Sequence, residues 1–318
     1  MEHRYLVTGS AGHLGEGLMR TLRARGVFAR GLDLHDSEFT DRRGSIADPE
    51  FVRQNMEGID VVLHSATLHK PHIESHDNQA FVETNITGTL TLLEAAIEAK
   101  VDAFIFTSTT STFGRALVPP AGAPAAWITE AVRPIPKNIY GVTKVSAEDL
   151  CELMHLQHGL PCLVLRTSRF FPEEDDDPEN RKAWDQENLR ANEYLHRRVD
   201  LEDAVQAHLL AAGKARELGF ARYIISAPPP FRIEQALSLR EGAAEVVSAL
   251  FPDYAEAYKR RGWRMYAAID RVYDSSKART ELGWQPRYDF RQVLDRLKED
   301  APVRSELARQ VGKKGYHR

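Results

Sequence analysis

Several features are scarce in this sequence of 318 residues, and each scarcity excludes a class of protein. Two cysteines, Cys151 and Cys162, are too few for a disulfide framework and match no metal-ligand spacing. No apolar run is long enough to cross a bilayer, and the first residues lack the apolar core of a signal peptide. A net charge of -4 gives no general attraction to nucleic acid or to an anionic membrane. We therefore expect a cytoplasmic protein whose partners are neither nucleic acids nor membranes.

The residues that are present alternate between short β-type apolar runs and longer helical patterns. Strands are expected at residues 5–8, 28–32, 60–64, 103–108, 162–166 and 222–226, and helices at 13–25, 78–99, from 140 onward, 233–250 and 290–298. This alternation is typical of an α/β protein with a parallel sheet. We expect a Rossmann-type, doubly wound sheet in residues 1–168 and a smaller substrate-binding region in residues 169–318, some segments of which return to the first domain. The charged C-terminal tail is expected to fray.

A glycine-rich turn directly follows the first expected strand and opens the first expected helix. Spaced glycines in this position let the backbone approach a pyrophosphate at the helix N-terminus. The turn contains the cofactor-binding candidates Gly9, Ala11, Gly12, His13, Leu14 and Gly15. Asp33 ends the next strand, where a carboxylate binds the ribose hydroxyls of NAD and repels the 2′-phosphate of NADP. NAD is therefore the expected cofactor.

The spacing of the glycines, T-G-x-x-G-x-x-G, is that of short-chain dehydrogenases, which prompts a search for a Tyr-x-x-x-Lys pair. Two such pairs occur, Tyr140 with Lys144 and Tyr273 with Lys277. Tyr140 opens a helix after the strand at 103–108, whose carboxyl end lies where α/β sheets bind ligands. We therefore predict that the first pair is functional and that the second is structural.

The first pair has the chemistry of a proton-transfer site. Residues four apart share one helical face, so the Lys144 ammonium lies beside the Tyr140 phenol and stabilises its phenolate. Tyr140 could then remove or return a hydroxyl proton while a nicotinamide takes or gives hydride. Thr109, just past the strand, could hydrogen-bond the same substrate oxygen. The alternative is that Tyr140 is an ordinary core tyrosine.

With these residues the sequence resembles the extended short-chain dehydrogenase/reductase family, also called the NAD-dependent epimerase/dehydratase family, over nearly the whole chain. The family's further motifs match His64-Ser65-Ala66, Asn85-Ile86-Thr87-Gly88-Thr89 and the Ser/Thr-rich strand end from Thr107 to Gly114. The resemblance implies a homodimer that pairs helices at 85–99 and 140–158, with Leu150, Leu153 and Met154 near the outer face of the second helix. It implies cofactor contacts from Ser45, Ile46, His64, Ser65, Ala66, Asn85, Thr107, Ser108, Tyr140 and Lys144, and substrate contacts from His69, Thr109 and Thr110.

Departures from the family pattern bear on the substrate. Thr110 and Ser111 stand where sugar-nucleotide dehydratases carry an acidic pair, so dehydration is not expected. Arg169 replaces the Asn that contacts the substrate diphosphate in sugar-nucleotide members, and the interval from it to Asp200 is short for the family. The acidic run Glu173–Asp177, expected as a solvated loop, would repel a diphosphate. Arg169 either binds a substrate carboxylate or phosphate or pairs with this acidic run.

A histidine cluster follows the third expected strand. His69, His72 and His76, with His64 upstream, have spacings that could hold a metal ion. The family's redox chemistry needs no metal, and in relatives this segment borders the nicotinamide and substrate. Polar lining of the cleft is therefore the favoured interpretation, and no metal site is expected.

The resulting hypothesis is an NAD-dependent dehydrogenase or epimerase acting on a secondary alcohol of a sugar, sugar acid or related small hydroxy compound. A UDP-sugar epimerase is the first alternative. A non-catalytic NAD(H)-sensing protein is the second, against which the complete set of Thr109, Tyr140 and Lys144 argues.

Overall fold

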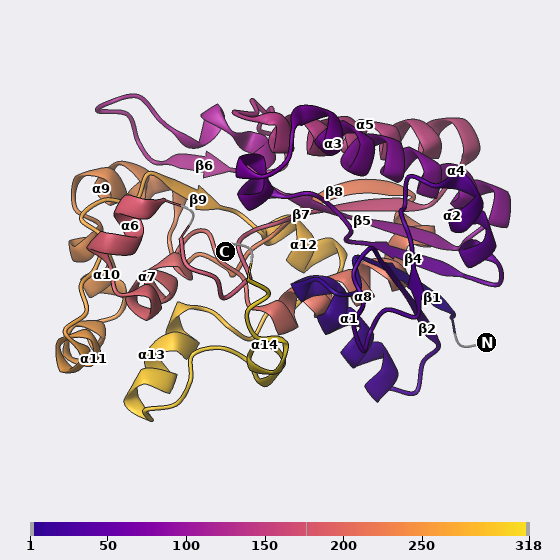
Figure 1. The fold of residues 1–318 in the computed structure, drawn as a ribbon. Helices are drawn as coiled ribbons and strands as arrows, with labels where there is room; N and C mark the ends of the chain where they lie inside the picture. Colours follow the sequence, from indigo (N-terminus) through magenta and orange to yellow (C-terminus); the bar gives the residue numbers. More distant parts are fainter. Residues whose placement is uncertain (1–2, 176, 316–318) are drawn as a thin grey trace.

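A seven-stranded parallel sheet forms the centre of the protein in the computed structural model, which describes residues 3–175 and 177–315 (Figure 1). Its strand order, β3-β2-β1-β4-β5-β7-β8, is that of a doubly wound Rossmann fold, and the predicted fold class is confirmed. The strands are β1 (Tyr5–Thr8), β2 (Ala29–Asp33), β3 (Arg42–Arg43), β4 (Val61–His64), β5 (Ala103–Thr109), β7 (Cys162–Thr167) and β8 (Phe220–Ile225).

The central strands are apolar throughout because both faces of the sheet are covered. Successive residues of β5 point to opposite faces: Ala103 and Ile105 join one apolar cluster, Phe104 and Phe106 another. Helices α1 (His13–Ala24), α8 (Leu201–Leu218) and α14 (Glu306–Val311) cover the first face. Helices α2 (Pro49–Met56), α4 (Gly88–Ala99) and α5 (Ile139–His158) cover the second (Figure 1).

The stretch expected as one helix at 78–99 is helical throughout but irregular in the middle. It consists of α3 (Asn78–Val82), the π-helical turn η2 (Glu83–Thr87) and α4. A π-turn inserts an extra residue into the helical repeat and often lies beside a functional site. Here the turn contains Asn85, whose side chain it directs inward.

The smaller region has its own apolar cluster, which includes Tyr258, Val272 and Phe290. The expected helix at 233–250 is interrupted at Gly242, where its two halves meet. The elements here are β6 (Ala126–Ile128), paired with β9 (Arg271–Tyr273), and α6 (Pro178–Ala183), α7 (Gln186–Glu193), η5 (Ile233–Gln235), α9 (Ala236–Glu241), α10 (Ala243–Leu250), α11 (Tyr254–Arg261) and α13 (Phe290–Lys298).

Segments late in the chain return to the main sheet. The strand β8 extends its edge, with α12 (Ser276–Glu281) packed against β8. The C-terminal tail does not fray as expected over its described part, because α14 packs against α1 and the Lys314 ammonium pairs with Glu16. No helix within residues 3–175 and 177–315 has both the length and the apolar character that a bilayer crossing requires.

Candidate functional site

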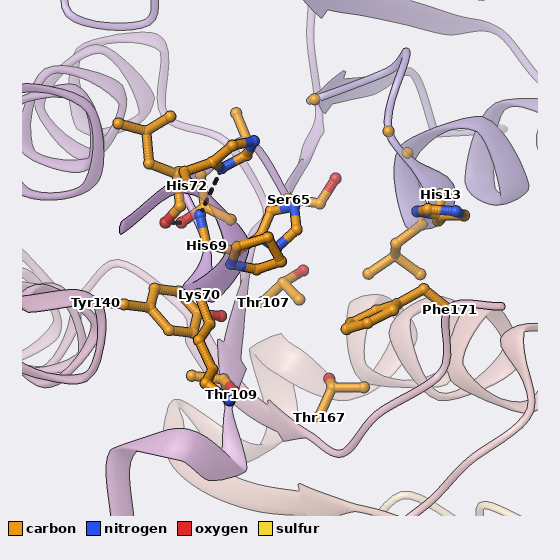
Figure 2. A pocket seen from close by; sticks show the side chains of 18 of the residues that line it. His13, Ser65, His69, Lys70, His72, Thr107, Thr109, Tyr140, Thr167 and Phe171 are labelled. Carbon is orange, nitrogen blue, oxygen red and sulfur yellow. Dashed lines mark hydrogen bonds between the residues drawn. The ribbon is translucent and has the colours of Figure 1, made fainter. Parts of the chain in front are cut away.

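A cavity of about 950 Å³ opens at the carboxyl ends of the parallel strands, where the strand order reverses between β1 and β4 (Figure 2). The structure brings nearly all of the predicted site residues to its walls. They are Gly9, Ala11, Gly12, His13, Leu14, Gly15, Asp33, Ser45, Ile46, Ser65, Ala66, His69, Thr107, Ser108, Thr109, Thr110, Tyr140, Lys144 and Arg169.

The glycine turn forms a cradle, a space that a side chain at Gly9 or Gly15 would fill. Gly9 has a φ of +73°, and a Cβ there would lie 2.7 Å from the backbone nitrogen of Ala66. A Cβ on Gly15 would lie 1.9 Å from the carbonyl oxygen of Gly9. Gly12, the residue before α1, offers no side-chain cap, so the first amides of this helix are left for an anion in the cavity.

Asp33 is fixed beside this cradle by two backbone amides. Its Oδ2 accepts from the Ala11 nitrogen at 3.0 Å, and its Oδ1 accepts from the His35 nitrogen at 2.8 Å. The carboxylate therefore lines the cavity at a set position, bound to the turn that precedes α1. A glycine cradle with an uncapped helix and a neighbouring carboxylate fits the pyrophosphate and adenosine ribose of a dinucleotide.

His64, predicted to contact the cofactor, lies behind the cavity wall instead. The Thr89 hydroxyl donates to the Asn85 carbonyl at 2.8 Å, so it accepts from His64 Nε2 at 2.9 Å. His64 Nδ1 is then the acceptor for the Thr8 hydroxyl at 2.7 Å. Burial lowers the pKa of His64 well below its usual value, and the neutral ring ties β1 and β4 to α4.

Asn85 is likewise outside the cavity lining, where we predicted a cofactor contact. Its Oδ1 accepts from the Leu68 nitrogen at 2.8 Å, and its Nδ2 donates to the Leu68 carbonyl at 2.9 Å. The same Nδ2 donates to the Thr143 hydroxyl on α5 at 3.0 Å. Asn85 therefore positions the loop after β4 against the helix that carries Tyr140 and Lys144.

Tyr140 and Lys144 lie one helical turn apart on α5 and both reach the cavity. In Figure 2 the Tyr140 ring and the Thr109 and Lys70 side chains project into the same part of it. Lys144 is 2% exposed and its ammonium lies 4.3 Å from the centre of the Phe106 ring. Burial lowers the pKa of Lys144 to about 7, against the opposing effect of the Glu148 carboxylate.

Thr107 and Ser108 face opposite sides of β5. His208 Nδ1 lies 2.8 Å from the Ala204 carbonyl and must donate to it, so His208 Nε2 accepts from the Thr107 hydroxyl at 2.9 Å. The Thr107 oxygen therefore keeps its lone pairs for a partner in the cavity. The Ser108 hydroxyl, predicted to contact the cofactor, donates instead to Glu148 at 2.5 Å on the α5 side.

The histidines after β4 border the cavity on the turn η1 (Lys70–Glu74) and its flanks. The His69 nitrogen donates to His72 Nδ1 at 3.0 Å, and the two ring centres lie 4.4 Å apart. Burial lowers the pKa of His72 to about 4. Across the described ranges no three His, Cys, Asp or Glu side chains are arranged to hold a metal ion.

The acidic run is not a solvated loop, because Glu173 and Asp175 are buried; Asp176 lies outside the described residues. Glu173 Oε2 lies 3.1 Å from His13 Nε2, and Glu173 Oε1 accepts from the Lys314 nitrogen at 2.6 Å. Burial acts to raise the pKa of Glu173, but the interactions with His13 and the backbone hydrogen bonds, including that from Lys314, together outweigh it and lower the pKa to about 2. The segment thus crosses from β7 to the glycine turn, with Phe171 beside His13 (Figure 2).

Arg169 pairs with this acidic segment, as one of its two predicted roles required. Its Nη1 donates to Asp175 Oδ2 at 3.2 Å, and its Nη2 donates to the carbonyls of Glu173 and Glu174 at 3.2 and 2.6 Å. These donors shape the loop. The lining also includes residues from distant segments that were not among the predicted site residues, such as Lys70, Phe171, Arg197 and Arg271.

Tyr273, assigned a structural role together with Lys277, also lines the cavity. It ends β9, whereas Lys277 lies on α12 and donates to the Arg222 carbonyl at 3.2 Å. The two residues therefore share no helical face and form no catalytic pair.

A family model for NAD dependent epimerase/dehydratase enzymes matches residues 5–221, which is more than half of the chain. The chain belongs to the NAD dependent epimerase/dehydratase family. This membership confirms the predicted family, the predicted NAD cofactor and the prediction of an NAD-dependent enzyme of the epimerase/dehydrogenase type.

Similar proteins span almost the full length of this family member. The UDP-glucose 4-epimerase of Rhizobium meliloti is 28% identical, with 91% of this chain and 94% of that protein covered. A short-chain dehydrogenase/reductase superfamily protein of Agrobacterium tumefaciens, solved with bound NAD, is 22% identical with a TM-score of 0.67, covering 97% of each chain. UDP-glucuronic acid 4-epimerase of Bacillus cereus, solved with UDP-glucuronic acid and NAD, is 23% identical with a TM-score of 0.64, with 97% of this chain and 99% of that chain covered. At these identities the solved structures establish the shared fold.

Replacing Lys144 by Met should stabilise the fold while it removes the ammonium. Burial of Lys144 makes the folded state bind this proton less tightly than the unfolded state does, so the wild-type protein gains stability as the pH rises from 7 toward 10. The variant should therefore unfold at a higher urea concentration than the wild-type protein at pH 7, with a free energy of unfolding larger by roughly 2 to 4 kcal/mol. This difference in free energy should shrink by pH 9.5. The exposed Lys137→Met is the matched control. A Lys144→Met advantage that is absent, or equal at both pH values, would contradict the burial penalty.

Proposed function

We propose that this protein uses NAD to oxidise a secondary alcohol of a sugar, sugar acid or related small hydroxy compound. The product is either released as a ketone or reduced again from the other face, which makes the enzyme a dehydrogenase or an epimerase. The placement of Tyr140 and Lys144 on one face of α5, with Thr109 in the same part of the cavity, is the observation that carries this proposal.

Each residue at the site has a role that its surroundings support. The first amides of α1 hold the pyrophosphate and Asp33 holds the adenosine ribose. Bound NAD supplies the hydride acceptor. Tyr140 takes the proton of the substrate hydroxyl, and the protonated Lys144 lowers the cost of the phenolate that receives it. The Thr109 hydroxyl, which also accepts from the Ser111 nitrogen at 3.1 Å, donates to the same substrate oxygen.

A non-catalytic NAD(H)-binding protein is disfavoured because burial of the Lys144 ammonium is energetically unfavourable. The ammonium of Lys144 is buried beside an aromatic ring, with a pKa lowered to about 7. Burial of a charge is unfavourable and persists mainly where a function depends on it. A protein that only sensed NAD(H) has no use for a phenol and an ammonium in the substrate part of the cavity.

A UDP-sugar epimerase is the second candidate, favoured by curated relatives of that name. Against it stands the short interval between Arg169 and Asp200. Arg169 gives its hydrogen bonds to the segment that follows it, and Arg190 and Arg198 pair with Glu187 and Glu193. This interval is thus occupied by its own ion pairs rather than open to a nucleotide.

Tyr140→Phe should abolish most turnover and leave NAD binding intact, because it removes only the transferable proton. Purified protein and NAD are offered free sugars, sugar acids and UDP-sugars, and NADH absorbance and product stereochemistry are followed. We expect the wild-type protein to act on a small substrate more efficiently than on a UDP-sugar, with turnover at least about 100-fold lower in Tyr140→Phe. Isothermal titration with NAD is the control for the intact fold. Near-native turnover by Tyr140→Phe would show that the proton is transferred elsewhere.

The protein should bind NAD more tightly than NADP. The fixed Asp33 carboxylate accepts hydrogen bonds from the ribose hydroxyls of NAD and repels the 2′-phosphate of NADP. Isothermal titration of both nucleotides measures the preference, and Asp33→Ala should narrow it. Equal or tighter binding of NADP by the wild-type protein would exclude this role for Asp33.

We also propose a homodimer that pairs α4 with α5 across the interface. Val142, Leu153 and Leu156 are exposed on α5, whereas Met154, expected near the outer face, is buried in the core. Apolar residues exposed along one helix favour association. Light scattering at micromolar concentration should give a mass twice that of the chain, and Leu153→Glu with Leu156→Glu should halve it. A monomeric wild-type protein would exclude the dimer.

A further inference from the structure

The charged residues of the cavity are unevenly distributed. Lys314, one of the lining residues, is paired with Glu16 of α1. Asp33 and Asp36 line it near the glycine turn, at the end of β2. The part nearer to Tyr140 and β7 is lined by five cations and one carboxylate. The cations are Lys70, Lys144, Arg169, Arg197 and Arg271, and the carboxylate is Asp175.

Asp175 offsets only part of this positive charge, since it is one carboxylate that contacts two of the five cations. Its Oδ2 accepts from Arg169 Nη1 at 3.2 Å and lies 3.7 Å from Arg197 Nη2. Its Oδ1 accepts from the Asp177 nitrogen at 2.9 Å and from Asn180 Nδ2 at 3.3 Å. The remaining positive charge of this part of the cavity is therefore open to an anion.

Arg197 and Arg271 both line this part of the cavity, and neighbouring carboxylates hold both side chains in place. Arg197 Nη2 lies 2.8 Å from Glu193 Oε1, and the side chain stays 23% exposed. Arg271 donates through Nη1 to the two oxygens of Asp270 at 3.1 and 3.2 Å, and it stays 18% exposed. Within the part of the chain that the structure describes, Arg271 Nη2 has no protein acceptor.

The two arginines are neighbours around His196. His196 Nδ1 donates to the Arg271 carbonyl at 3.1 Å, and the His196 carbonyl accepts from the Tyr273 nitrogen at 3.1 Å. Burial, together with the charges of Arg197 and Arg271, lowers the pKa of His196 well below its usual value. The His196 imidazole is therefore neutral. It joins the two segments by hydrogen bonding and places no charge between the two arginines.

We infer that Arg197 and Arg271 form an anion subsite that holds the carboxylate of a sugar acid, with its secondary alcohol at Tyr140 and Thr109. This inference rests on the proposed function and names its substrate class. A planar carboxylate matches the fork of N–H donors that a guanidinium presents. Partners already hold both side chains in place, so little side-chain entropy is lost when the anion binds.

The test measures binding apart from turnover. Tyr140→Phe saturated with NAD is titrated calorimetrically with glucuronate, with glucose 6-phosphate, with glucose and with UDP-glucose. We expect glucuronate to bind at least about tenfold more tightly than the other three. Arg271→Gln, made in the same background, should remove about tenfold of the glucuronate affinity and leave glucose unchanged. Arg271→Lys should restore part of it.

Arg271 is the more informative position because its removal leaves only the half-exposed Asp270 unpaired, whereas removal of Arg197 deprives the buried Glu193 of one of its two arginine partners. The exposed Arg133→Gln is the matched control. Equal affinity for glucose and glucuronate, tighter binding of the phosphate or of UDP-glucose, or no effect of Arg271→Gln would each overturn the inference. Tight, Arg271-dependent glucuronate binding with neither NADH formation nor an epimerised product from the wild-type protein would support the subsite and contradict the proposed function.

Discussion

The parallel direction of all seven strands is the constraint on which the site depends. Every crossover must pass over a face of the sheet, so the carboxyl ends of the strands meet at one edge. The crossovers after β1 and β4 leave toward opposite faces, which opens a gap that the sheet itself cannot fill. The glycine turn, Asp33, Thr109 and the start of α5 follow these ends or face them. Residues far apart in the sequence thereby line one cavity.

A layer of polar side chains behind the cavity keeps its walls in place. His64 joins β1 and β4 to α4, and Asn85 joins the loop after β4 to α5. Both are buried with their hydrogen bonds satisfied, and His64 is neutral, so neither adds charge to the site. Lys144, one helical turn from Tyr140, is then the buried cation of this wall.

The parts of the site that the sequence predicted are those that local geometry dictates. Gly9 and Gly15 are needed because no Cβ fits the turn, and Tyr140 and Lys144 share a face because of the helical repeat. Motif identity does not tell which side of a wall a side chain faces. His64 and Asn85 lie outside the cavity lining, and Ser108 lines the cavity although its hydroxyl donates to Glu148. The meeting of Arg197 with Arg271 was not predicted, because the segment after α7 and β9 come together only through tertiary contacts that no local pattern specifies.

The buried acidic segment changes the reason for expecting a small substrate. An exposed run of carboxylates repels a diphosphate, but Glu173 lies against His13 and Asp175 against Arg169 and Arg197. With these partners the segment exerts little net repulsion, and the cavity near Tyr140 is cationic. Electrostatics therefore favours an anion there rather than excluding one. What argues against a nucleotide substrate is the interval between Arg169 and Asp200, which is short for the family and in which Arg169, Arg190 and Arg198 are bound to nearby acceptors of the protein.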